Sequence, residues 1–185
     1  MKRLFVCIPY LPGSQFNSMM RELKNSCQGD RINWVKPGHM HCTIQFLGDC
    51  NEELIPVINE AVAMAARGIA PFSVVSGGLG YFGSPGQPKV LWAGWEDNGM
   101  AESLFRRLSP ILQKAGISEP ENHYHPHITI GRVKFSQNPS LLVNTLKRYR
   151  DDIHDRFTAT QVCLMESRLT PEGPVYEIIT QIPLV

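Results

Sequence analysis

The feature that most constrains this sequence is a four-residue pattern of histidine, apolar residue, threonine and isoleucine that occurs twice. The two copies are His41-Cys42-Thr43-Ile44 and His127-Ile128-Thr129-Ile130. Each copy lies in a run of alternating apolar and polar residues, at 40–47 and 125–133, which is typical of a half-buried β-strand. Because residues i and i+2 point to the same face of a strand, each copy presents an imidazole and a hydroxyl side by side.

The spacing of the two copies indicates a chain built from two similar halves, because close to half of the 185 residues separate His41 from His127. A single copy is better explained by a strand that has a polar outer face, so the functional hypothesis depends on the duplication. Two such strands facing each other would place both imidazoles, together with the hydroxyls of Thr43 and Thr129, around one small cavity. We predict a catalytic site there.

The chemistry of these groups suits a phosphodiester. Histidine acts as acid or base near neutral pH without a large shift of its pKa. One imidazole would protonate the departing oxygen while the other takes a proton from the attacking water, and threonine hydroxyls would donate hydrogen bonds to the non-bridging oxygens. This chemistry needs no metal. The alternative is that both histidines are structural.

A metal site is a second competing interpretation. His39 and His41 share one strand face, and His123, His125 and His127 alternate along another, so five imidazoles would converge. Threonines, which are not preferred metal ligands, occupy the next positions on the same faces, and no carboxylate interrupts the cluster at ligand spacing. We therefore predict a site without a metal or other cofactor.

Composition bounds the class of protein. A length of 185 residues with 43% hydrophobic and 19% charged residues fits one compact globular domain. The five cysteines are scattered without a C-x-x-C pair, which favours a reducing cytoplasm over a disulfide framework. No stretch approaches 18 apolar residues, so no membrane span is expected. A net charge of +1 argues against coating of long nucleic acids and is compatible with one RNA end.

Hydrophobic periodicity predicts an α+β domain in two similar halves. The expected helices are at 14–27 with Ser14 as N-cap, from Asp49 or Asn51 to 67, at 100–115 and at 141–149. The expected strands are at 3–10, 31–35, 40–47, 72–75, 89–95, 125–133, 157–167 and 175–182. Pro110 is expected to kink or end its helix, and residues 171–174 are expected to form a turn.

Residues 77–88 hold five glycines and two prolines, and we interpret them as a long connecting loop. Glycine-rich loops cradle phosphates in some proteins. Neither the P-loop pattern nor the dinucleotide-binding pattern is present here, so both of those functions are excluded on pattern.

Taken in order, several segments resemble the RNA 2′,3′-cyclic phosphodiesterases, also called 2′-5′ RNA ligases, of the two-histidine phosphoesterase superfamily. The resemblance covers nearly the whole chain. Its segments are residues 3–6, Trp34, the first histidine motif, residues 46–48, residues 88–94, residues 126–132, residues 166–169, Gly173 and Tyr176.

The resemblance implies a single bilobal domain over residues 1–185 with pseudo-twofold symmetry, in which two antiparallel sheets line a central cleft and helices lie outside. It implies metal-independent hydrolysis of an RNA-terminal 2′,3′-cyclic phosphate to a 2′-phosphomonoester. His41 would be the proton donor and His127 the proton acceptor. Thr43 and Thr129 would hold the phosphate, with Arg132 adding a cation. Some members are also named for reversible 2′-5′ joining of RNA ends.

Two further residues are candidates for substrate binding. Phe46 would either stack a nucleobase or belong to the core. His125, like His39, is an extra imidazole beside a motif histidine; we assign His125 to substrate binding and expect no role for His39. The expected partners are RNA termini or short oligonucleotides, and we expect a cytoplasmic monomer. The alternative functions are a phosphodiesterase for another cyclic or 2′-5′-linked nucleotide, and a non-catalytic module that binds RNA ends.

Overall fold

The computed structural model describes residues 1–117, 123–170 and 173–185, and these contain helices and strands in both halves of the chain. The helical elements are α1 (Ser14–Ser26), η1 (Pro37–His39), η2 (Glu52–Leu54), α2 (Ile55–Ala66), α3 (Met100–Lys114) and α4 (Pro139–Lys147). The strands are β1 (Lys2–Pro9), β2 (Arg31–Trp34), β3 (His41–Cys50), β4 (Phe72–Ser84), β5 (Gln87–Glu96), β6 (His127–Phe135), β7 (Ile153–Ala159), β8 (Gln161–Thr170) and β9 (Gly173–Pro183).

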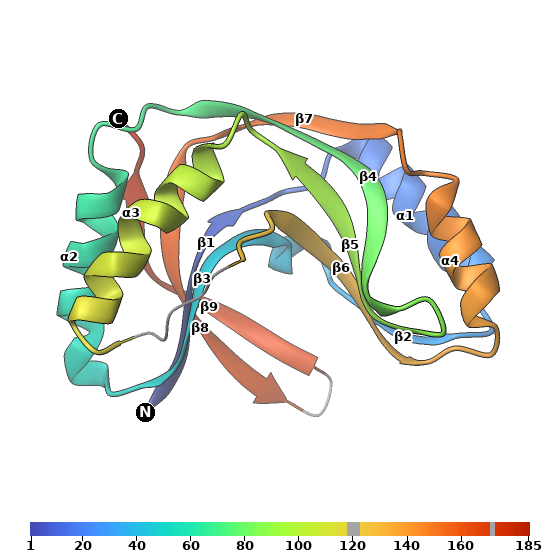
Figure 1. Cartoon of the computed structure of the whole chain (residues 1–185), viewed down its shortest axis with the longest axis horizontal. Coiled ribbons are helices and arrows are strands. Elements are labelled where there is room, and N and C mark those ends of the chain that lie inside the picture. Colours follow the sequence, from blue (N-terminus) through green and yellow to red (C-terminus); the bar gives the residue numbers. More distant parts are fainter. Residues whose placement is uncertain (118–122, 171–172) are drawn as a thin grey trace.

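The strands form one curled antiparallel sheet in the order β7-β4-β5-β6-β3-β1-β8-β9, with β2 paired to β6 (Figure 1). The order runs outward from the two central strands as β3-β1-β8-β9 on one side and β6-β5-β4-β7 on the other. We call these sides the first lobe and the second lobe. The predicted bilobal α+β fold is confirmed, and its two sheets are halves of one hydrogen-bonded sheet.

Helices cover the convex side of this sheet (Figure 1). α2 and α3 lie over the first lobe, while α1 and α4 lie over the second lobe. Each helix buries an apolar stripe, as α1 does with Phe16, Met19, Met20 and Leu23. The concave side carries a second, small apolar cluster of Phe5, Cys7 and Cys163. No helix in the described part of the chain has the length and apolar character needed to cross a membrane.

The predicted loop at 77–88 is wrong. β4 continues to Ser84 and pairs with β5 almost to the turn. The glycines serve irregularities of the strand: the pairing register shifts between Gly77 and Leu79 and again between Phe82 and Gly83. Such bulges need residues that tolerate unusual backbone angles, and Gly83 has a φ of +112°. The glycine content therefore marked a bent strand.

The predicted single strand at 157–167 is also wrong. β7 ends at Ala159 and β8 begins at Gln161, because the chain changes lobe at this point. β7 pairs with β4 in the second lobe, whereas β8 pairs with β1 and β9 in the first lobe. A run of β-prone residues does not reveal a change of partner. The expected turn at 171–174 includes residues 171–172, which lie outside the described residues.

Two expectations about helices are corrected. α3 passes through Pro110 to Lys114, because Leu104, Leu108 and Leu112 are buried on one face before and after the proline. Packing of that face outweighs the loss of one backbone hydrogen bond. The N-cap of α1 is Gly13 and not Ser14, and the Gly13 N–H donates to Asp155 Oδ2 at 2.7 Å.

A buried carboxylate organises the start of α3. Asp97 accepts hydrogen bonds from the N–H groups of Met100 at 3.0 Å and Ala101 at 2.8 Å, and from Trp95 Nε1 at 2.7 Å. Its side chain thereby pairs the first free N–H groups of the helix and fixes the preceding strand end.

We expect Asp97→Ala to lower the free energy of unfolding by about 2–4 kcal/mol, because three donors, two of them buried, lose a charged acceptor. Glu102→Ala is the control: Glu102 forms an exposed ion pair with Arg106, whose loss costs under about 1 kcal/mol. Urea denaturation of both variants measures the difference. Equal midpoints for the two variants would contradict this role of Asp97.

Candidate active site

The two histidine motifs lie side by side at the junction of the lobes. β3 and β6 are antiparallel neighbours through the pair Cys42 and Ile128, whose side chains are fully buried. Continuing this register sets His41 opposite Thr129 and Thr43 opposite His127. All four side chains are half-buried on the face opposite Cys42 and Ile128. The structure thus brings together the four residues that the sequence pattern singled out.

Each motif histidine is oriented by a backbone carbonyl two residues earlier. Nδ1 of His41 lies 2.8 Å from the carbonyl oxygen of His39, and Nδ1 of His127 lies 2.7 Å from that of His125. A carbonyl oxygen only accepts, so Nδ1 carries the hydrogen in both rings. Nε2 is left as the nitrogen that can take up or release a proton. The extra histidines therefore contribute through their backbone.

Aromatic rings hold both imidazoles in place. The His41 ring lies 4.8 Å from that of Phe5 and 5.1 Å from that of Tyr176, the latter at 88°. The His127 ring lies 4.9 Å from that of Phe82 at 86°. The sequence analysis assigned no role to Phe5 or Phe82. Phe5 lies in a predicted strand, whereas Phe82 falls in the segment predicted to be a loop, so only the pairing of β1 with β3 and of β4 with β5 places both rings beside the imidazoles.

Burial lowers the pKa of both motif histidines. The pKa of His41 falls to about 4, chiefly by desolvation; the bond to the His39 carbonyl opposes this, and the positive charges of His127 and Arg132 add to it. Desolvation also lowers the pKa of His127, with His125 and Arg132 adding to the effect. Both rings are therefore neutral at pH 7.

Phe46 and Arg132 occupy equivalent places in the two lobes. The pairing of β3 with β1 skips Ile44, and the pairing of β6 with β5 skips Ile130. Each bulge re-aims the strand after its threonine, so the residue five positions beyond each motif histidine is exposed. Phe46 is 61% exposed, which excludes its core interpretation and leaves its ring free to stack. Arg132 is the cation of the second lobe near both imidazoles.

His39 and His125 occupy equivalent positions, two residues before the motif histidine of each lobe. The His125 ring packs 5.1 Å from that of Trp92 and 5.5 Å from that of Phe82, and the His39 ring lies 5.4 Å from that of Tyr176. His125 is the more exposed of the two. The structure thus leaves the His125 ring accessible at the edge of the site.

Tyr124 ties the second motif to the first lobe. Its hydroxyl donates to the Thr43 carbonyl at 3.1 Å, and its ring stacks on Phe105 of α3 at 4.7 Å and 7°. This contact supplements the single pair between β3 and β6. The sequence analysis gave Tyr124 no role.

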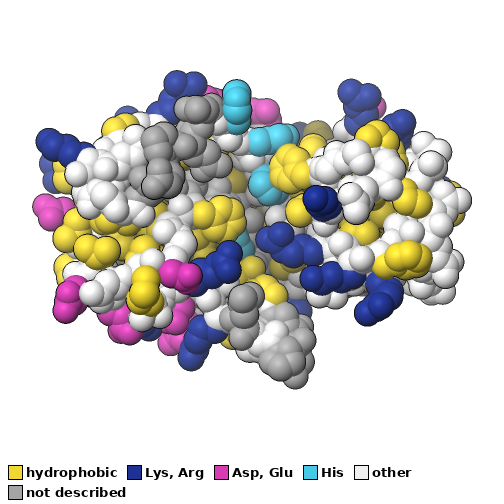
Figure 2. All heavy atoms as spheres, turned by 60° about the horizontal axis from the view of Figure 1, so that its bottom comes forward, with side chains coloured by type: hydrophobic (Ala, Val, Ile, Leu, Met, Phe, Trp, Pro, Cys, Tyr) yellow, Lys and Arg dark blue, Asp and Glu magenta, His cyan; other side chains and the backbone are white. Residues whose placement is uncertain are grey.

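The surroundings are electropositive. In Figure 2 the histidines gather between the lobes, and Lys and Arg side chains extend from there over the right-hand lobe, whereas most Asp and Glu side chains lie on the left-hand lobe. The ion pairs of the described residues are Lys2 with Glu166, Arg106 with Glu102, and Arg168 with Glu177. Arg132 is in none of them. No group of three or more His, Cys, Asp or Glu side chains within residues 1–117, 123–170 and 173–185 is arranged to hold a metal ion.

Comparison with known proteins identifies the family. The LigT-like phosphoesterases match residues 9–92 and 97–176. The chain belongs to this family. A Methanocaldococcus jannaschii protein named RNA 2′,3′-cyclic phosphodiesterase is 33% identical over 151 residues, covering 81% of this chain and 83% of its own. A protein of the same name from Thermotoga maritima is 34% identical over 154 residues, covering 82% and 79%.

Solved structures agree on the fold of this LigT-like phosphoesterase. The Thermus thermophilus protein TT0787 superposes with a TM-score of 0.76 at 27% identity, covering 98% of this chain and 97% of its own. Escherichia coli LigT complexed with 3′-AMP gives a TM-score of 0.74 at 17% identity, covering 100% and 98%. The family resemblance noted from the sequence is confirmed.

We expect the imidazole of His41 to titrate near pH 4 in the free protein and at higher pH in saturating inorganic phosphate, because an anion stabilises the imidazolium. The ring Cε1–H chemical shift followed by NMR against pH measures this, and His41→Asn assigns the signal. A midpoint near 6.5 that phosphate leaves unchanged would contradict the desolvated, anion-binding site.

Proposed function

We propose that this protein hydrolyses RNA-terminal 2′,3′-cyclic phosphates to 2′-phosphomonoesters without a metal. The observation that carries the proposal is the pair of imidazoles, His41 and His127, which meet at one junction with Nδ1 protonated and Nε2 available. The names of the relatives from Methanocaldococcus jannaschii and Thermotoga maritima support the substrate class.

The reaction needs one base and one acid on opposite sides of the phosphorus. In the proposed mechanism His127 Nε2 takes a proton from water as the water oxygen bonds to phosphorus. The bond from phosphorus to the ribose 3′-oxygen breaks, and His41 Nε2 delivers a proton to that oxygen. This order of roles follows the family resemblance. His41 must be protonated first, and the bound anion raises its pKa for this purpose.

The remaining site residues bind the phosphate and the terminal nucleobase of the substrate. Thr43 and Thr129 donate hydrogen bonds to the non-bridging oxygens, where negative charge grows in the transition state. Arg132 neutralises the phosphate from the second lobe. Phe46 stacks the terminal nucleobase, which its exposure allows, and His125 contacts the substrate from the edge of the site.

The same geometry supports a second reaction. When an RNA 5′-hydroxyl takes the place of water, attack on the cyclic phosphate with departure of the 3′-oxygen yields a 2′-5′ linkage. Run backwards, the reaction cleaves that linkage. This reversible joining is part of the proposal, as are action in the cytoplasm and a monomeric protein.

We expect His41→Ala and His127→Ala each to lower kcat on a 2′,3′-cyclic nucleotide by about 100-fold or more, the usual scale of general acid–base catalysis. His123→Ala is the control, since His123 is exposed and outside the motifs. Loss of the high-pH decline in the first variant, and of the low-pH decline in the second, assigns acid and base. Near-normal turnover by both variants would refute the mechanism. If His41→Ala removed the low-pH decline and His127→Ala the high-pH decline, the two roles would be reversed.

Hydrolysis should proceed at an unchanged rate in EDTA, because the proposed proton transfers use only side chains. The assay measures the rate with and without added divalent ions and identifies the phosphate position by chromatography against 2′- and 3′-nucleotide standards. Loss of activity in EDTA with rescue by a divalent ion would favour the metal alternative.

A panel of 2′-5′-linked and other cyclic nucleotides separates the substrate alternatives, and binding without turnover of every member would indicate a non-catalytic module.

A further inference from the structure

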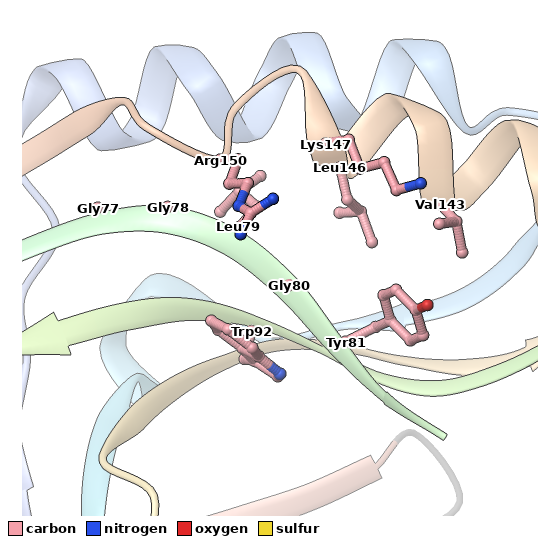
Figure 3. Close-up of a pocket in the computed structure, with 10 residues that line it drawn as sticks. All are labelled: Gly77, Gly78, Leu79, Gly80, Tyr81, Trp92, Val143, Leu146, Lys147 and Arg150. Carbon is pink, nitrogen blue, oxygen red and sulfur yellow. The ribbon is translucent and has the colours of Figure 1, made fainter. Parts of the chain in front are cut away.

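A cavity apart from the two histidine motifs lies between α4 and the β4–β5 hairpin (Figure 3). We call it the α4 cavity. Its volume is about 420 Å³, within the range of small-molecule sites. Apolar groups, two aromatic rings and two cations line it, among them Leu79, Tyr81, Trp92, Leu146, Lys147 and Arg150.

Glycines keep the strand side of the α4 cavity bare. Gly78 has a φ of +61°, and a Cβ there would lie 2.7 Å from the Arg150 carbonyl oxygen. A Cβ at Gly80 would overlap the Trp92 ring. The ring therefore packs under the bare Gly80 backbone, on the side of β4 away from α4 (Figure 3).

The two cations are available for an anion. Lys147 and Arg150 are exposed, and the ion pairs found among the described residues involve neither of them. A lysine at a helix C-terminus also has a structural explanation in the helix dipole. Arg150 lies beyond the end of α4, however, and both side chains come from the α4 side while Tyr81 and Trp92 come from the hairpin (Figure 3).

The α4 cavity is next to the histidine site. Trp92 is one of the residues around the α4 cavity, and its ring lies 5.1 Å from the His125 ring and 5.7 Å from the Phe82 ring. Phe82 in turn contacts His127 at 4.9 Å. Tyr81 and Phe82 are successive residues of β4, so their side chains point to opposite faces of the sheet. Only the β4–β5 hairpin separates the two sites.

We propose that the α4 cavity binds a nucleotide upstream of the cyclic phosphate in the same RNA strand. The base lies against Tyr81, because an aromatic surface stacks any base. The phosphate lies at Lys147 and Arg150. This inference rests on the proposed function and adds to it a preference for oligonucleotides over mononucleotides.

The test compares KM for an RNA oligonucleotide ending in a 2′,3′-cyclic phosphate with KM for a 2′,3′-cyclic mononucleotide. Lys147→Ala and Arg150→Ala should each raise the oligonucleotide KM about tenfold and leave the mononucleotide KM within about twofold. Each should also reduce the salt slope of oligonucleotide binding by about 0.7, the value for one phosphate contact on a single strand. Arg148→Ala is the matched control, since Arg148 turns to Thr145 Oγ1 at 3.4 Å and does not line the α4 cavity.

An unchanged oligonucleotide KM in both variants would overturn the inference. So would an equal rise for both substrates, or an equal effect of Arg148→Ala, which would show a general effect of charge. If the wild-type protein turns over neither substrate, the proposed catalysis fails by itself. Fluorescence anisotropy with a labelled oligonucleotide ending in a 2′-phosphate then tests the α4 cavity independently: a weaker Kd confined to Lys147→Ala and Arg150→Ala supports it, and any other pattern overturns it.

Discussion

The juxtaposition of the two histidine motifs depends on the contact between Cys42 and Ile128, through which the two lobes become one sheet. Both side chains are fully buried, so the backbones of β3 and β6 are fixed to each other at the second residue of each motif. Side chains on either side of such a pair share the opposite face. A slip of one residue would turn the imidazoles into the core and expose the apolar residues.

Equivalent positions of the two lobes carry different side chains, and a reaction that uses one acid and one base needs such a difference. Equivalent bulges expose an aromatic ring at Phe46 in one lobe and a guanidinium at Arg132 in the other. The pKa of His41 is lowered to about 4, and its ring sits between two aromatic side chains. The imidazoles of His41 and His127, at equivalent positions of the two lobes, thus have different surroundings, as the proposed acid and base require.

The sequence was sufficient for the repeated strands, most helices and the four motif side chains, because strand alternation and apolar spacing are local properties. The sequence was not sufficient where the structure depends on which strands pair with each other. The glycines of residues 77–88 suggested a loop, yet they bend a strand whose partner is β5. The residues at 157–167 suggested one strand, although their partners lie in different lobes. Phe5, Phe82 and Tyr124 gained their positions only through pairing between distant segments.

If His41 and His127 act on one phosphorus atom in one step, their contributions to catalysis are coupled. A double-mutant cycle on kcat/KM for a 2′,3′-cyclic nucleotide, with His41→Ala, His127→Ala and the double variant, measures this coupling directly. Paired action predicts that the double variant falls no more than about tenfold below the slower single variant. A loss equal to the product of the two single losses would show that the imidazoles act independently, and would contradict the shared site.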